Sequence, residues 1–210
     1  MTQYALDISL PVAYAPEQFM LSESNRLAYD WIMRWPGWPG NALYLHGERG
    51  AGKTHLAHLW QQQAQAAFLP ADAQDLPAGA SIIDGIEQWQ NEQALFHLYN
   101  HCKSENIPLL ITSALTPEQL PFALPDVRSR LKSLPVASIA APDDALLSAV
   151  LIKQLGDRQL KIEPDVLHYM LPRLPRSFAE LTALVARLDS DLLASGRTLT
   201  IPFVRQLCGW

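Results

Sequence analysis

The feature of this sequence that most constrains its fold is the stretch at residues 47–54, which reads GERGAGKT. It matches the pattern G-x-x-x-x-G-K-[ST] at every fixed position, with an apolar run before it and a helix-like run after it. In such a motif the loop amides turn toward phosphate groups, the lysine reaches the terminal phosphates, and the threonine hydroxyl can bind Mg²⁺. A glycine-rich turn that contains Lys-Thr by coincidence is the alternative. We therefore predict a phosphate-binding loop with these nucleotide-binding candidates: Gly47, Glu48, Arg49, Gly50, Ala51, Gly52, Lys53, Thr54 and His55.

A second candidate for the same site is Asp84, which follows the apolar run at residues 80–83. An aspartate at the end of a buried strand is typical of the carboxylate that positions Mg²⁺ in enzymes with a phosphate-binding loop. The alternative is an aspartate that caps the turn after the strand. The sequence thus predicts a magnesium site formed by Thr54 and Asp84.

The composition narrows the class of protein. The chain has 210 residues, 49% of them hydrophobic and 18% charged, which is typical of a globular protein. Its 16 lysines and arginines are outnumbered by 21 aspartates and glutamates, so the net charge of -5 does not favour sequence-blind binding to DNA. The two cysteines, Cys102 and Cys208, lack metal-type spacing and are typical of free thiols in a reducing compartment. No apolar run approaches the ~20 residues needed to cross a bilayer, and no signal peptide is evident. We therefore expect a cytoplasmic protein without a membrane partner.

The order of the predicted elements indicates the fold class. Strand-like apolar runs lie at residues 42–46, 67–70, 80–85, 107–113 and 135–139. Residues 124–132 are typical of a basic turn or short helix, and from Pro142 onward only helical patterns follow. Strands alternating with helices, and then helices alone, predict an α/β fold with a parallel sheet flanked by helices and a small C-terminal helical lid. The expected parts are an extended segment at 1–22, a nucleotide-binding subdomain at 23–140 and a helical lid subdomain at 141–210.

These residues resemble a known family. The stretches that resemble the AAA+ module of the replication initiator DnaA are residues 24–29, 50–56, 82–84, 98–100, 110–113 and 130–133. Those that are more similar to the DnaA-related Hda regulators are residues 94–100, 124–131 and 199–204. The resemblance to the DnaA/Hda family covers nearly the whole chain. The helix-turn-helix domain and the N-terminal interaction domain of DnaA have no counterpart in this sequence. The resemblance therefore implies a P-loop AAA+ module, with a RecA-like subdomain and a lid, and little else.

The resemblance implies a nucleotide, partners and an activity. The implied ligands are ADP or ATP with Mg²⁺, and the implied partners are DnaA and the DNA polymerase sliding clamp. Hda-type proteins act with the clamp to stimulate hydrolysis of DnaA-bound ATP, which prevents re-initiation. Arg130 is similar to the family's box VII arginine, which points across an AAA+ interface at a neighbour's nucleotide as an arginine finger. Arg128 is an alternative finger, and an Arg130 that merely pairs with a surface carboxylate is the structural alternative.

Two further sites follow from the resemblance. Hda-type proteins bind the clamp through an N-terminal peptide of the form Q-L-[SD]-L-P-L. The best match here is the stretch Asp7, Ile8, Ser9, Leu10, Pro11 and Val12, in which the aspartate replaces the glutamine and loses the donors of its amide. The family also places apolar side chains before the first helix against adenine, which here are Phe19, Met20 and Leu21.

The chain departs from the family at the acid that positions the attacking water. Gly85 follows Asp84 where the more active members carry a second acid. Glu87 is close, but its spacing is wrong for that role. The resemblance therefore implies a chain without its water-positioning base.

It also departs at two sensor positions. Ala114 stands where DnaA has an aspartate, and Ala179 stands at the sensor 2 arginine, for which Arg176 is the nearest substitute. Loss of the water-positioning acid and of a sensor residue should leave nucleotide binding intact and slow the hydrolysis of ATP. We therefore expect at most a weak ATPase, whose nucleotide is a structural ligand.

Other functions stay open at this point. An autonomous AAA+ ATPase, a loader or a motor, would use Lys53, Asp84 and Arg130 in its own homo-oligomer. A DnaA-binding tether would have no effect on hydrolysis. A homodimer is a further alternative, and direct sequence-specific DNA binding is not expected.

Overall fold

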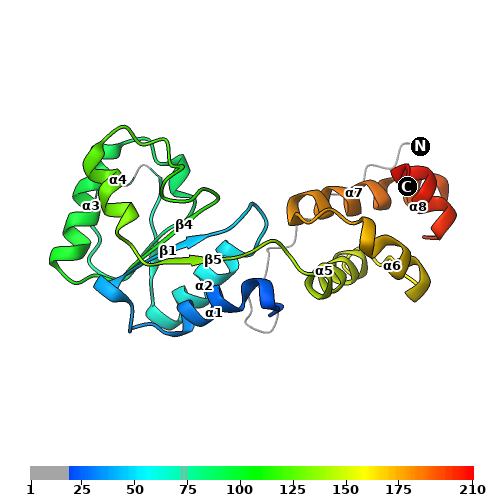
Figure 1. Ribbon diagram of the computed structural model, residues 1–210, viewed down its shortest axis with the longest axis horizontal. Helices are drawn as coiled ribbons and strands as arrows, with labels where there is room; N and C mark the ends of the chain where they lie inside the picture. Colours follow the sequence, from blue (N-terminus) through cyan, green and yellow to red (C-terminus); the bar gives the residue numbers. More distant parts are fainter. Residues whose placement is uncertain (1–18, 72, 74) are drawn as a thin grey trace, which may run out of the picture.

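The structure of the protein is a computed structural model that describes residues 19–71, 73 and 75–210. Its elements form two groups along the long axis of the molecule (Figure 1). One group is a sheet with helices on both sides, which we call the sheet part. The other group holds the last four α-helices of the chain, which we call the lid.

A five-stranded parallel sheet forms the centre of the sheet part. Its strands are β1 (Ala42–His46), β2 (Ala67–Phe68), β3 (Ser81–Ile83), β4 (Leu109–Ser113) and β5 (Val136–Ser138), in the order β2-β3-β4-β1-β5. Since the strands are parallel, their carboxyl ends meet at one edge. β1 lies between two strands that come later in the chain, so the loop after β1 opens at the topological switch point of the sheet, where α/β proteins bind ligands.

Helices cover both faces of the sheet because alternate side chains of each strand point in opposite directions. The four helices are α1 (Glu23–Met33), α2 (Lys53–Ala64), α3 (Glu92–Ser104) and α4 (Pro125–Lys132). Leu43 and Leu45 of β1 pack with α1 and α2 on one face. Tyr44 of β1 packs with α3 and α4 on the other face. Burial on both faces explains why β1 is a continuous apolar run in the sequence.

A cluster of tryptophans joins α1 and the loop before β1 to α2. The buried indole of Trp38 stacks on Trp60 of α2 with ring centroids 4.9 Å apart, and Trp35 meets Trp60 edge-on at 6.2 Å. Trp38 Nε1 donates a hydrogen bond to the carbonyl of Trp31 (2.7 Å). These large buried side chains fix α2, and with it the loop at the amino end of α2, against the sheet.

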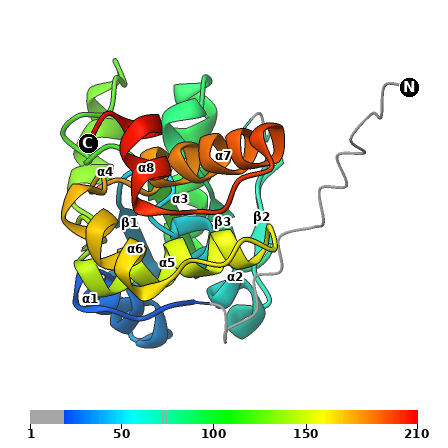
Figure 2. The same ribbon diagram turned by 90° about the vertical axis from the view of Figure 1, so that its right-hand side faces the viewer.

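The lid is a helical bundle with its own core (Figure 2). It consists of α5 (Asp144–Gly156), α6 (Pro164–Met170), the 3₁₀ turn η4 (Leu171–Arg173), α7 (Phe178–Ser195) and α8 (Ile201–Cys208). Asp143 caps α5, because its carboxylate accepts a hydrogen bond from the amide of Leu146 (2.7 Å). The side chains of Leu146 and Phe178 pack into the core of α1 and α2 together with Ala51, so the lid contacts the loop after β1.

The predicted fold class is confirmed, with strands at all five predicted places and helices alone after residue 143. The strands are shorter than the predicted apolar runs. β3, for example, ends at Ile83 and leaves Asp84 and Gly85 in the loop that follows. Residues 125–132 form α4, with Pro125 in the first turn, where a backbone N–H is not needed.

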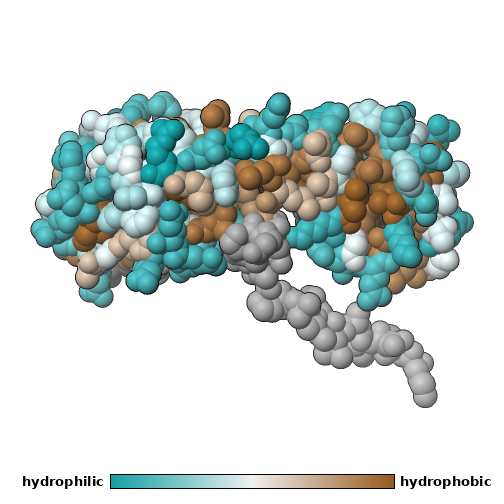
Figure 3. Space-filling view, turned by 90° about the horizontal axis from the view of Figure 1, so that it is seen from below, coloured by the Kyte–Doolittle hydropathy of each residue, from teal (hydrophilic) through white to brown (hydrophobic). Residues whose placement is uncertain are grey.

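Apolar and hydrophilic side chains share the surface. On the face drawn in Figure 3, apolar residues gather at the middle of the molecule and on the lid, and hydrophilic residues cover most of the remainder. The exposed large apolar side chains include Leu27 of α1, Ile152 of α5 and Leu193 of α7. Among residues 19–71, 73 and 75–210, no helix is both long enough and apolar enough to cross a bilayer.

Candidate functional site

The phosphate-loop motif lies between β1 and α2, as the sequence predicts. Gly50 and Gly52 have φ values of +80° and +95°, a backbone region that favours glycine. A Cβ atom on Gly50 would also lie only 3.0 Å from the Cβ of Phe178 in the lid. The amide of Gly47 donates to the carbonyl of Ser113 at the end of β4 (3.2 Å). The glycines are therefore required by the shape of the loop and by the close approach of the lid.

Lys53 opens α2, and its ammonium group folds back over the loop. Its Nζ donates hydrogen bonds to the carbonyls of Gly47 (2.6 Å) and Glu48 (2.8 Å). Burial lowers the pKa of Lys53 below its usual value, and the negative charges of Glu87 and Asp84 oppose that shift. Lys53 is thus held inside the loop, close to two carboxylates at the carboxyl edge of the sheet.

Asp84 and Thr54, the predicted magnesium ligands, are in contact. Thr54 Oγ1 donates to Asp84 Oδ2 (2.9 Å), and Thr112 Oγ1 of β4 donates to Asp84 Oδ1 (2.5 Å). The amide of Gly85 in turn donates to Thr112 Oγ1 (3.0 Å). A carboxylate and a hydroxyl are oxygen ligands of the kind that Mg²⁺ uses beside water and phosphate oxygens, so the two residues fit the predicted ion. The described residues contain no group of three or more His, Cys, Asp or Glu that could hold a metal by itself.

Glu87 reaches the same edge, although its spacing in the sequence argued against a role there. It lies in the short 3₁₀ helix η3 (Ile86–Gln88). Its Oε2 accepts a hydrogen bond from Ser113 Oγ (2.7 Å), and its Oε1 accepts one from the amide of Ala114 (3.2 Å). The carboxylate is therefore held at the end of β4, beside Ala114.

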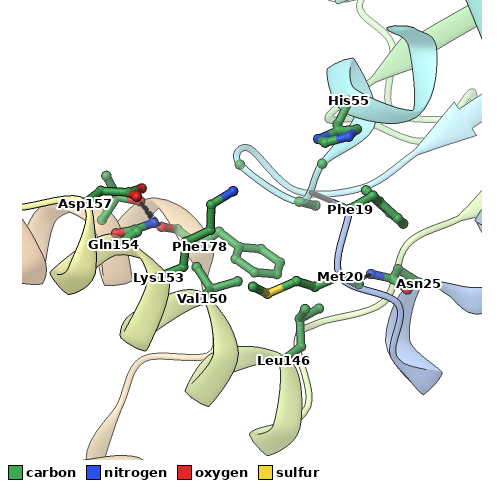
Figure 4. Close-up of a pocket in the computed structure, with 14 residues that line it drawn as sticks. Phe19, Met20, Asn25, His55, Leu146, Val150, Lys153, Gln154, Asp157 and Phe178 are labelled. Atoms are coloured by element: carbon green, nitrogen blue, oxygen red, sulfur yellow. Dashed lines mark hydrogen bonds between the residues drawn. The ribbon is translucent and has the colours of Figure 1, made fainter. Parts of the chain in front are cut away.

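A pocket of about 340 Å³ opens beside the loop, between the sheet part and the lid (Figure 4). The predicted residues that line it are Phe19, Met20, Gly50, Ala51, Gly52 and His55. The ring of Phe19 lies 5.2 Å from that of His55 and stacks on Tyr29 at 6.0 Å. Asn25 Nδ2 donates to the carbonyl of Met20 (2.8 Å), which fixes the segment that carries both apolar side chains. An aromatic ring beside an apolar floor suits the flat base of a nucleotide.

The other side of the pocket comes mostly from the lid, and sequence reasoning missed it. Figure 4 shows Met20 reaching toward Val150 of α5 and Phe178 of α7. The missed lining residues are Asn25, Leu146, Val150, Lys153, Gln154, Asp157, Phe178 and Thr182. The members from α5 recur every three or four residues and so share one helix face. That periodicity was readable in the sequence, but nothing local identifies the loop that the face meets.

Several predicted site residues do not line this pocket, among them Gly47, Lys53, Thr54 and Asp84. Leu21 is 43% exposed, residues 48–49 are exposed, and Arg176 forms an ion pair with Asp144 at the start of α5. Their contacts with a nucleotide stay predictions. The clamp-peptide candidates at residues 7–12 lie outside the described residues.

Arg130, the predicted arginine finger, lies on α4 and does not line the pocket. Its guanidinium carbon lies 5.1 Å from the ring centre of Phe96 and 5.8 Å from that of Tyr99, both on α3. Within the part of the chain that the structure describes, its buried Nε has no hydrogen-bond partner and the side chain forms no ion pair. Arg128 on the same helix is exposed. Arg130 is thus held by two aromatic rings rather than by a described carboxylate.

Comparisons with known proteins agree with the resemblance seen in the sequence. Residues 144–208 match the family model of the Hda lid domain. Domain III of the replication initiation protein DnaA from Thermotoga maritima has a TM-score of 0.74 at 19% identity, covering 94% of this chain and 96% of that one. AMPPCP-bound DnaA from Aquifex aeolicus has a TM-score of 0.67 at 20% identity, covering 85% of this chain and 65% of that one. The RuvB Holliday junction branch migration motor from Thermotoga maritima has a TM-score of 0.59 at 16% identity, covering 80% of this chain and 61% of that one.

The extent of these matches defines what this chain shares with DnaA. The chain spans about two thirds of the Aquifex aeolicus DnaA and nearly all of the Thermotoga maritima domain III. At these identities the likeness is one of fold. The predicted AAA+ fold is therefore confirmed, and the match of residues 144–208 to the Hda lid domain confirms the resemblance to the DnaA/Hda family.

Proposed function

We propose that this protein is an adenine-nucleotide-binding regulator of replication initiation that stimulates hydrolysis of the ATP bound to DnaA. The lid that matches the Hda lid domain and the fold of DnaA domain III support the family part of the proposal. The phosphate loop and the neighbouring pocket support the nucleotide part. In this proposal the chain's own nucleotide, ADP or ATP, holds the lid against the loop, and the chemistry that matters takes place on DnaA.

The residues present fit a nucleotide with Mg²⁺. Lys53 and the loop amides would bind the phosphates, Phe19 and Met20 would contact the base, and Thr54 and Asp84 would hold the ion. When bound, the ion neutralises charge on the outer phosphate oxygens. The chain itself orients the side-chain oxygens of Thr54 and Asp84 that would hold the ion. It does so by the hydrogen bonds from Thr54 and Thr112 to Asp84.

The observation that carries the proposal is the environment of Arg130. The buried Nε–H of Arg130 has no acceptor among residues 19–71, 73 and 75–210, which is unfavourable unless the guanidinium gains one. The rings of Phe96 and Tyr99 hold the group but accept no ordinary hydrogen bond. Phosphate oxygens of a neighbour's nucleotide are suitable acceptors, since guanidinium binds them in a bidentate manner.

The test is an assay of DnaA-bound ATP hydrolysis, with and without DNA-loaded clamp. An arginine finger in trans contributes about 10³- to 10⁵-fold to hydrolysis, so Arg130→Ala should return DnaA to its unstimulated rate. The same variant should bind ADP as tightly as the wild type, measured by calorimetry. Lys132→Ala is the matched control, since it removes an exposed cation from the same helix.

Three other outcomes of the hydrolysis assay would contradict or change the proposed role of Arg130. Full stimulation by Arg130→Ala refutes the finger role, and loss in Arg128→Ala alone moves the role to that residue. Retention of DnaA without any effect on hydrolysis would show a tether instead.

The clamp and the compartment complete the proposal. Deleting residues 7–12 should abolish the additional stimulation that DNA-loaded clamp provides. The reason is that an extended apolar peptide suits a shallow apolar groove.

We further propose that residues 23–140 and 141–210 act as two subdomains, and that the protein works in the cytoplasm. Sedimentation of the purified chain would decide between a monomer and a homodimer.

A further inference from the structure

We propose that Glu87 is the carboxylate that activates water in this chain's own nucleotide site, so that the chain hydrolyses ATP by itself. The resemblance to more active family members implied that this acid is absent, because Gly85 follows Asp84. The inference goes beyond the regulation of DnaA, since it concerns the nucleotide that this chain binds. It depends on the phosphate loop and not on Arg130.

The backbone after β3 brings Glu87 back to the carboxyl edge of the sheet. β3 and β4 are in register with Ile83 beside Ile111, so Asp84 follows next to Thr112. Gly85 then adopts a φ of +75°, a region that favours glycine, and directly precedes η3. The glycine that replaces the second acid therefore makes the turn that returns the chain toward β4. Glu87, two residues after that glycine, takes the place of the missing acid.

The carboxylate of Glu87 is anchored by both of its oxygens. Ser113 Oγ and the amide of Ala114 each donate to one oxygen, at 2.7 Å and 3.2 Å. The Ser113 hydroxyl is fixed in turn, because its oxygen accepts a hydrogen bond from the amide of Leu115 (3.0 Å). Each carboxylate oxygen keeps a free lone pair after accepting one hydrogen bond. Glu87 is thus oriented and still able to accept a bond from water.

The same anchor connects Glu87 to the phosphate loop. The carbonyl of Ser113 accepts a hydrogen bond from the amide of Gly47, the first residue of the loop. The negative charges of Glu87 and Asp84 both act on the ammonium group of Lys53, which reaches the terminal phosphates in such loops. Through Ser113, Glu87 is therefore linked to the first residue of the loop that is expected to hold the terminal phosphate.

Ala114 is consistent with this arrangement. An aspartate at this position, as in DnaA, would bring a second carboxylate beside Glu87, and two like charges at short distance disfavour each other's ionised form. With alanine at this position, no second carboxylate lies beside Glu87, which accepts a hydrogen bond from the amide of the same residue. One carboxylate thus occupies the region of both missing acids.

The reaction balances with groups that the site and the substrate supply. A water oxygen forms a bond to the terminal phosphorus of ATP. The bond from that phosphorus to the oxygen bridging the last two phosphates breaks, and its electron pair leaves with ADP. Glu87 accepts one proton of the attacking water and releases it to solvent.

The test is single-turnover hydrolysis of ATP by the full chain in the absence of DnaA. Glu87→Gln keeps the size of the side chain and an acceptor oxygen but removes the charge. We expect it to lower the rate constant by about 100-fold, the effect of one general base. Ser113→Ala, which keeps the charge and removes one anchor, should lower it by about tenfold. Glu92→Gln is the matched control and should be unchanged, because Glu92 also accepts two hydrogen bonds, but from the amides of Ala123 (2.9 Å) and Leu124 (2.6 Å) before α4 rather than from residues at the end of β4.

A second measurement separates a catalytic role from a bracing role. Calorimetry should show that Glu87→Gln binds ADP like the wild type and binds AMPPCP at least as tightly, because a negative charge near the terminal phosphate has been removed. Weaker binding of both ligands would show that Glu87 only braces β4, and would overturn the proposal. A wild-type rate no higher than that of Lys53→Ala, or an unchanged rate in Glu87→Gln, would overturn it as well. Because DnaA is absent, none of these outcomes bears on the role of Arg130.

Discussion

Replacing Gly50 with alanine tests whether the lid packs on the phosphate loop. Two costs are expected from the structure. The φ of +80° places residue 50 in the left-handed region, which costs a side chain about 1 kcal/mol. The new Cβ would also lie 3.0 Å from the Cβ of Phe178 and 3.3 Å from the amide nitrogen of Ala179. These atoms belong to the backbone region of α7, so they cannot move unless the helix moves.

Gly196→Ala is the matched control. Gly196 ends α7 with a φ of +61°, and a Cβ there would meet nothing within 4 Å. The free energy of unfolding of Gly196→Ala should therefore fall only by the cost of the left-handed backbone, about 1 kcal/mol. The free energy of unfolding of Gly50→Ala should fall by a further ~1–3 kcal/mol, because the new methyl group overpacks the contact if the lid stays in place. If the lid moves away instead, the pocket opens and binding of ADP weakens, by about tenfold for each 1.4 kcal/mol.

Urea denaturation and calorimetry with ADP measure these two effects on the same samples. The expected result is that Gly50→Ala loses more unfolding free energy than Gly196→Ala, or binds ADP at least about tenfold more weakly, or both. Equal losses of stability in the two variants, together with wild-type affinity for ADP, would refute the contact between the lid and the loop.

Two other predictions concern the pocket and the thiols. Lys153 lines the pocket, so Lys153→Ala should weaken ADP binding by about fivefold, the effect of one partly screened charge of ~1 kcal/mol. Arg176→Ala should leave ADP binding unchanged, because Arg176 pairs with Asp144. If calorimetry gives the reverse order, Arg176 is the sensor 2 substitute. Burial raises the pKa of Cys102 to about 11, so alkylation at pH ~8 followed by mass spectrometry should modify Cys208 first and Cys102 only on unfolding. Because the unfolded Cys102 ionises first, the free energy of unfolding should fall as pH rises from ~8.5 toward about 11, and a rise would contradict the buried thiol.

The phosphate loop could be predicted because its determinants are local. Gly50 and Gly52 are fixed by backbone shape, and Lys53 follows them directly, so the motif is complete within a few residues. The strand β1 before it is buried on both faces and is therefore a continuous apolar run. Asp84 was equally accessible, since it follows directly on the buried strand β3.

The remaining site residues could not be predicted because they depend on distant partners. Lys153 reaches the pocket only because α5 packs beside the loop, and the sequence of α5 does not identify the surface that its polar face meets. The spacing of Glu87 from Asp84 argues against a role beside it, whereas the place of Glu87 at the end of β4 depends on the turn at Gly85 and on the pairing of β3 with β4. Arg130 was identified by resemblance, but its two aromatic neighbours on α3 depend on how that helix packs against α4.

The tryptophan cluster gives the two parts of the molecule very different optical signals. Of the six tryptophans, only Trp210 belongs to the lid, while Trp31, Trp35, Trp38, Trp60 and Trp89 lie in the sheet part. Trp60 is fully buried and Trp38 nearly so, and their emission should therefore be blue-shifted in the folded protein and move to the red when the sheet part opens. Melting of the lid alone would change the fluorescence little but would strongly change the helical circular dichroism signal. The difference between the two spectra would therefore separate the unfolding of the lid from that of the sheet part.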